Sequence, residues 1–178
     1  KTVTLSFWVK SSIAGTYGIC LQNAASGATR CYATSYTISS ANTWEQKTIT
    51  ISGDTSGSWV GASNACAINI LFSAGVGSSW QTSTINAWQS NGFLFPNTIT
   101  NTIISTSGAT IQWSGVQLEV GSTATAFEWR PYTTELQLCQ RYYYLHATGG
   151  AGVPIGYATN YTASIMLGYI QFPTTMRS

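Results

Sequence analysis

Apolar residues recur at every second position through most of the first 120 residues of the chain. Leu5, Phe7 and Val9 share one face of an extended segment, while the residues between them take the other. This period belongs to half-buried β-strands rather than to helices. Similar strands, separated by turns rich in Gly, Ser and Asn, are expected at 17–21, 31–38, 44–51, 66–72, 99–104 and 110–120.

Because no helical pattern interrupts these segments, we expect an all-β fold built as an antiparallel β-sandwich. Among sandwiches we expect a jelly roll. The last segment changes phase, since the apolar side chains before Ser114 share one side and those after Gly115 share the other. This shift predicts a β-bulge or bend at Ser114–Gly115.

One segment departs from the alternation. From Pro131 to His146 apolar and aromatic residues fall at helical spacing, and Pro131 and Glu135 suit a first helical turn. Gly149–Gly150 is expected to end this helix. Both of its sides are apolar or aromatic, so we expect one side to pack on the sandwich and the other on a neighbouring subunit or domain. The residues expected at the subunit interface are Leu138, Tyr142 and Tyr143.

The chain is therefore expected to hold a jelly-roll sandwich over residues 1–130 and a connecting helix over 131–147. Strand-like alternation returns after the helix, so residues 148–178 are expected to begin a second small β domain. The chain also opens inside a strand pattern. We therefore expect it to be a piece of a longer polypeptide, with further strands of the sandwich before Lys1.

Charged residues make up only 7% of the chain, roughly a quarter of ordinary usage. Aromatic residues reach 13%, which is typical of a folded rather than a disordered chain. The polar surface must then come from Ser, Thr, Asn and Gln, which suits a protein that stays assembled, so we expect a homo-oligomer. A net charge of +2 without a basic stripe argues against nucleic-acid binding. No apolar run approaches the ~20 residues of a membrane span, so membrane insertion is not expected.

Residues able to carry catalysis are few. Glu119 and Glu128 are the one carboxylate pair that could flank a glycosidic bond, although Arg130 offers Glu128 a simpler structural ion pair. His146 is the only histidine, and no nucleophile motif accompanies it. Asp54 is the only residue from which a calcium site could be built. We therefore expect no enzymatic activity, no metal and no cofactor.

Cys20 and Cys31 could face each other across a hairpin. The spacing of the cysteines fits no metal site, so two alternatives remain: a disulfide between these two, or buried free thiols.

Several aromatic residues fall in or near loops rich in Ser, Asn and Gln. Aromatic rings in such loops can stack on the apolar faces of sugars, or they can cap the core or fill a subunit contact. The candidate glycan-binding residues are Trp59, Trp80, Trp88 and Phe93. The strand residues Trp8, Trp44 and Trp113 are expected in the core or at an interface.

Longer motifs run through most of the chain, namely Leu5–Ser11, Asn42–Glu45, Gly115–Gly121, Phe127–Tyr132, Glu135–Tyr143 and Phe172–Arg177. With these motifs the chain resembles a family of tailed-bacteriophage virion proteins common among marine phages. The block from Gly115 onward is the specific part. Trp129 stands where the family pattern more often has Arg, and Ala126 where it often has Pro, which bears on the loop before the helix.

The resemblance implies a carbohydrate-binding-like jelly roll, carried in tail fibres or other external virion proteins and commonly trimeric. It also implies a module without enzymatic function. The expected partners are further copies of the chain, other virion proteins and a host-surface glycan. The alternatives are a head fibre or capsid decoration without a ligand, and a polysaccharide depolymerase acting through Glu119 and Glu128.

Overall fold

The structure is a computed structural model, and it describes residues 1–23, 30–60, 66–90, 92, 94–146, 158–168 and 171–176. The chain forms two compact units, Lys1–Phe127 and Glu128–Ser178. The division lies three residues before the boundary expected after residue 130.

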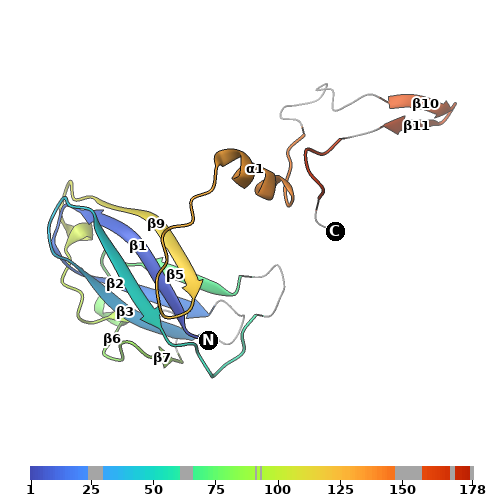
Figure 1. The fold of residues 1–178 in the computed structure, drawn as a ribbon. Helices are drawn as coiled ribbons and strands as arrows, with labels where there is room; N and C mark the ends of the chain where they lie inside the picture. Colours follow the sequence, from blue (N-terminus) through green and yellow to red (C-terminus); the bar gives the residue numbers. More distant parts are fainter. Residues whose placement is uncertain are drawn as a thin grey trace. The chain divides into compact units, whose positions relative to one another are not determined.

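The first unit consists of two antiparallel sheets packed face to face (Figure 1). One sheet has the order β4 (Glu45–Ile51), β1 (Val3–Ser11), β9 (Ile111–Val120). The other has the order β5 (Ile68–Phe72), β2 (Gly15–Asn23), β3 (Cys31–Ile38), β7 (Trp88–Gln89). The chain crosses between the sheets after β1, β3, β4 and β7, as in a jelly roll. The predicted all-β sandwich with one short helix is confirmed.

Aromatic and aliphatic side chains from both sheets form the core. The alternation in β1 buries Leu5, Phe7 and Val9 completely. The ring of Phe7 lies 5.0 Å from that of Tyr36 and 5.2 Å from that of Phe72, both in the opposite sheet. Full burial of one such side chain contributes roughly 1.5–3 kcal/mol, so these contacts hold the two layers together.

A second apolar layer covers the outer face of the larger sheet. Cys20 and Cys31 on that face are buried beneath Leu94 and Phe95. The covering segment contains the short elements η1 (Ser78–Trp80), β6 (Gln81–Thr82), β8 (Phe95–Pro96) and η2 (Ile103–Ser105). β6 and β8 pair in parallel.

The strand expected over residues 99–104 is wrong. The amides of Thr100 and Asn101 both donate to the carbonyl of Thr16, at 3.0 and 3.2 Å, and the chain then turns into η2. Ile104 is 78% exposed. A short apolar run does not by itself distinguish a strand from a covering loop, and here Ile99 belongs to the layer over the sheet.

The predicted bulge in β9 is confirmed. Ser6 pairs with Gln117 and Trp8 with Ser114, so three steps along β9 oppose two along β1. Gly115 takes a φ of +56°, which glycine adopts without strain. Beyond the bulge Leu118 pairs with Leu5 yet stays 36% exposed, because β9 is an edge strand.

The second unit holds the helix α1 (Tyr132–Gln140) and a hairpin of β10 (Ala158–Thr162) and β11 (Ile165–Gly168). The helix begins as predicted, with Pro131 at its N-cap and Glu135 in its first turn. It ends earlier than the predicted residue 147. The amides of Tyr142 and Tyr143 both donate to the carbonyl of Cys139 at 3.0 Å, so the final turn already includes two of the three consecutive tyrosines, whose helix propensity is modest.

Taken by itself, the second unit buries none of its described residues. The expected packing of one helix side on the sandwich and of the other on a neighbouring subunit or domain stays a prediction. The predicted interface residues Leu138, Tyr142 and Tyr143 are 42%, 63% and 70% exposed. The predicted stop at Gly149–Gly150 lies outside the described residues. No helix in the part of the chain that the structure describes is long and apolar enough to cross a membrane.

Candidate ligand-binding site

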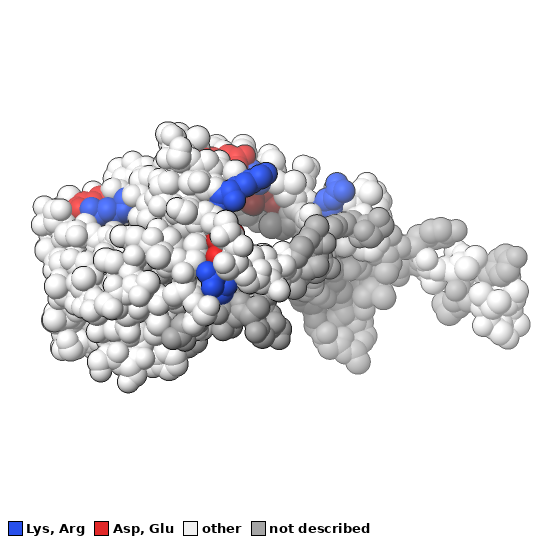
Figure 2. Space-filling view, turned by 90° about the horizontal axis from the view of Figure 1, so that it is seen from below, with Lys and Arg blue, Asp and Glu red and all other residues white. Residues whose placement is uncertain are grey.

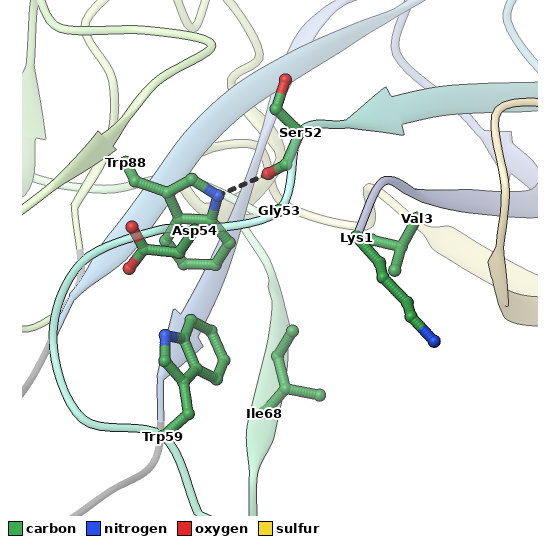
Figure 3. Close-up of a pocket in the computed structure, with 8 residues that line it drawn as sticks. All are labelled: Lys1, Val3, Ser52, Gly53, Asp54, Trp59, Ile68 and Trp88. Carbon is green, nitrogen blue, oxygen red and sulfur yellow. Dashed lines mark hydrogen bonds between the residues drawn. The ribbon is translucent and has the colours of Figure 1, made fainter.

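A hollow of about 210 Å³ opens at one end of the sandwich, where β1 begins and the loop after β4 passes β5 and β7 (Figure 3). Its walls are mainly apolar, and they combine two indole rings with aliphatic side chains and a few polar groups. The lining residues are Lys1, Val3, Ser52, Gly53, Asp54, Trp59, Ile68 and Trp88.

The two indoles meet edge to face. The ring centres of Trp59 and Trp88 are 5.3 Å apart with an interplanar angle of 86°. Trp88 is fixed from two sides, since its Nε1 donates to the Ser52 carbonyl at 2.7 Å and its ring lies 5.5 Å from that of Tyr32. Trp59 is 36% exposed, so a ligand can reach it.

An ion pair stands behind Trp59. Arg30 donates to both carboxylate oxygens of Asp54, and the Trp59 side chain also hydrogen-bonds Asp54. Burial tends to raise the pKa of Asp54. The hydrogen bonds from Arg30, Ser56 and Trp59, with the positive charge of Arg30, outweigh that effect and hold the pKa below its ordinary value.

The hollow has the make-up of a small-ligand binding site. Indole rings present flat apolar surfaces, and a few polar groups at the rim are typical of a small-ligand site. Its volume fits one ring of monosaccharide size and not an extended drug-sized ligand.

The structure brings together two of the four aromatic residues predicted for a glycan site, Trp59 and Trp88. Trp80 ends the short helix η1, is 49% exposed and does not line this hollow. Phe93 lies outside the described residues.

Sequence reasoning missed the polar part of the site. Asp54 lies five positions before Trp59 in the same turn-rich segment, which is a local signal that could have joined them. Arg30 belongs to the preceding hairpin, and its pairing with Asp54 appears only once the strands are assembled.

The strand tryptophans differ from one another. Trp113 packs against the core, and its Nε1 donates to the Tyr36 hydroxyl at 3.2 Å, as predicted. Trp8 and Trp44 are 42% and 43% exposed, so a core role for them is wrong, because both lie outside the space between the sheets. The Lys10 ammonium lies 5.8 Å from the centre of the Trp44 ring.

Glu119 and Glu128, the candidate catalytic pair, each have a structural partner. The Thr125 amide donates to Glu119 at 3.0 Å, and the Thr125 hydroxyl also donates to it, which lowers the pKa of Glu119. Glu128 forms an ion pair with Arg130 at 3.1 Å. The expected ion pair is confirmed.

The helix α1 ends at Gln140, well before His146. The centre of the His146 ring lies 5.9 Å from that of Tyr144.

Charged groups are sparse on the face seen in Figure 2, where acidic and basic side chains lie next to one another. The ion pairs among the described residues are Arg30–Asp54, Lys47–Glu45, Arg130–Glu128 and Arg130–Glu135. No cluster of three or more His, Cys, Asp or Glu side chains within the described ranges could hold a metal ion.

Cys20 and Cys31 are buried free thiols in the structure. The Cys20 thiol donates to Cys31, which raises the pKa of Cys20 and lowers that of Cys31. The sequence left two alternatives, a Cys20–Cys31 disulfide or two buried free thiols, and the structure has the free thiols.

Comparison of the chain with protein-family models, with curated proteins and with solved structures found no match.

Proposed function

We propose that this chain is a non-enzymatic structural module of a tailed-bacteriophage virion, carried in a tail fibre, and that it attaches to a host-surface glycan. The observation that carries the binding role is the hollow in which Trp59 and Trp88 meet. The virion assignment rests on the motif resemblance from Gly115 onward.

Two features of the hollow support a sugar as its ligand. An accessible indole can stack on the C–H face of a pyranose ring, and the neighbouring carbonyl and hydroxyl groups can take up hydroxyls at its edge. The site also lies on an end of a rigid sandwich, where an exposed position on a fibre would present it outward.

A glycan array probed with the intact chain tests the proposal. Trp59→Ala is expected to lower binding about 10-fold or more, since a buried aromatic contact commonly exceeds ~1.4 kcal/mol. Trp44→Ala is the matched control, because Trp44 is similarly exposed but lies outside the hollow. Equal binding by wild type and Trp59→Ala, or no bound glycan, contradicts the attachment role.

We also propose that the chain assembles as a homo-oligomer, a trimer, through its second unit. The exposed apolar residues there, including Leu138, Tyr142 and Tyr143, supply the contact. The weakly charged surface offers little to keep copies apart. Light scattering is expected to report three copies, and a stable, well-folded monomer at high concentration would contradict this.

The second candidate is a purely structural role in a head fibre or capsid decoration. The exposed apolar surface of the second unit favours it, because assembly alone explains that surface without any ligand. An assembled fibre that binds no glycan would favour this role over attachment. The depolymerase alternative has less support, since Glu119 and Glu128 are each engaged by structural partners.

A further inference from the structure

The ion pair behind Trp59 is unusually well enclosed for a chain with so few charges. Arg30 donates from Nε and Nη2 to the two carboxylate oxygens of Asp54, the second bond measuring 3.0 Å. The side chains are only 15% and 2% exposed. A two-pronged pair of this kind fixes geometry as well as charge.

The Asp54 side chain is only 2% exposed, so it offers a ligand almost no surface. Besides the two bonds from Arg30, it accepts from the Ser56 amide at 3.1 Å and from the Trp59 side chain. A carboxylate offers about four lone-pair positions, and the donors of Arg30 and Ser56 take three of them. Asp54 therefore acts on the hollow through the groups that it holds.

The guanidinium of Arg30 is equally committed. Its Nη1 donates to the Ser90 hydroxyl at 3.1 Å, and its Nε and Nη2 donate to Asp54, so three of its five N–H groups hold this arrangement. The loop is shaped around its stem, since a Cβ on Gly57 would come within 2.6 Å of the Arg30 Cδ, and Gly57 has a φ of +77°. Arg30 cannot turn toward a ligand without breaking its bonds to Asp54 and Ser90 and its contact with Gly57.

The remaining cation at the hollow is Lys1. Figure 3 shows its ammonium directed away from the two indole rings, while Val3 and Ile68 complete the apolar wall. An anionic sugar would thus meet indole and aliphatic surfaces with no facing cation among the lining residues.

We infer that Arg30 and Asp54 are positioning residues that set the orientation of the Trp59 ring, and that the hollow selects a neutral pyranose over an acidic one. The inference rests on the proposed glycan attachment. The charged groups Arg30 and Asp54 hold the shape of the wall, and the faces of the indole rings contact the ligand.

The positioning role is tested first without ligand. The full chain is labelled with 5-fluorotryptophan, and Trp59→Phe assigns the Trp59 signal in the ¹⁹F spectrum. Asp54→Asn and Arg30→Lys are expected to shift or broaden the Trp59 signal and to leave the Trp44 signal unchanged. An unmoved Trp59 signal in both variants would overturn the positioning role, whatever the protein binds.

Binding is then measured by titration with methyl β-galactoside, methyl β-glucoside and glucuronic acid. The wild type is expected to bind a neutral glycoside at least 10-fold more tightly than the acid. Asp54→Asn should weaken that binding about 10-fold in the wild type and by less than 2-fold in a Trp59→Phe background, where its hydrogen-bonding partner is gone.

The outcomes distinguish failure of the positioning role from failure of the proposed glycan attachment. An equal effect of Asp54→Asn in both backgrounds would show that Asp54 does not act through Trp59. Preference for glucuronic acid would overturn the neutral-ligand assignment. Absence of binding to every sugar by the wild type would refute the proposed function and the ligand class with it, while the fluorine spectra would still decide the positioning role.

Discussion

The two units of the chain differ in the burial of their aromatic and aliphatic side chains. In Lys1–Phe127 the alternation of β1 sends Leu5 and Phe7 between two sheets, where both are fully buried. In Glu128–Ser178 the described regular structure is one short helix and one hairpin, and no residue whose burial is described is buried. A lone hairpin or a nine-residue helix is marginal in water.

The difference teaches where each function belongs. The first unit has a core of its own and can hold the Trp59–Trp88 hollow rigidly. The described residues of the second unit present apolar surface and none of them is buried, which supports the proposal that further copies cover this surface. The proposed function therefore places ligand recognition in the first unit and assembly in the second.

The largest expected effect separates the units by core truncation. Phe7→Ala should lower the free energy of unfolding of the first unit by about 3–5 kcal/mol, because it empties a site between the sheets. Phe172→Ala in the second unit, where the ring is 49% exposed, should cost the monomer less than about 0.5 kcal/mol. Urea unfolding followed by tryptophan fluorescence measures both, and similar losses would erase the distinction.

The next effect concerns assembly. Tyr142→Ala and Tyr143→Ala should each weaken association by about 2 kcal/mol or more if their rings are covered by another copy. Sedimentation velocity over a concentration series measures this, with Trp44→Ala as the first-unit control. Unchanged association in both tyrosine variants would show that these rings do not bridge copies.

A smaller effect is acid sensitivity confined to the first unit. The pKa of Asp54 is lowered in the fold, so its stabilisation is fully present above its ordinary value of about 4 and is lost as the pH falls through the folded pKa. The melting temperature of the first unit should fall below about pH 4, and Asp54→Asn should flatten this decline. The charged groups at the site are Arg30 and Lys1, both positive throughout this range. An identical acid profile in the variant would contradict the assignment.

The smallest expected effect is a difference in cysteine reactivity, without any change in stability. A thiol reagent should label the exposed Cys66 and Cys139 in the native protein, whereas the buried Cys20 and Cys31 should react only after unfolding. Mass spectrometry counts the labels, with the denatured protein as the reference. Two labels in the denatured, unreduced protein instead of four would indicate a Cys20–Cys31 disulfide.

Much of the first unit could be predicted because strand periodicity is local. The alternation around Phe7 and the phase shift at Gly115 correspond to a buried face and a bulge. The run at 99–104 was misassigned because a short apolar stretch looks alike in a strand and in a covering loop. The helix was predicted too long because its spacing continues through Tyr142 and Tyr143, while the backbone turns at Cys139.

Only part of the candidate site could be predicted from the sequence. Trp59 and Trp88 stood out as aromatic residues in polar loops, but nothing local indicated that they meet. The link between Arg30 and Asp54 spans 24 positions and depends on how the hairpin and the loop after β4 are brought together. Long-range pairing of this kind is a property of the assembled sandwich.

Hydrogen exchange of the whole chain across a concentration series tests the division between the units most directly. At the lowest concentration, amides of β1, β2 and β3 should be protected, and those of α1 and the β10–β11 hairpin should exchange almost freely. At high concentration the second unit should gain protection, while the first should stay unchanged. Equal protection of both units in the monomer, or a second unit that stays unprotected in the assembled protein, would contradict the account.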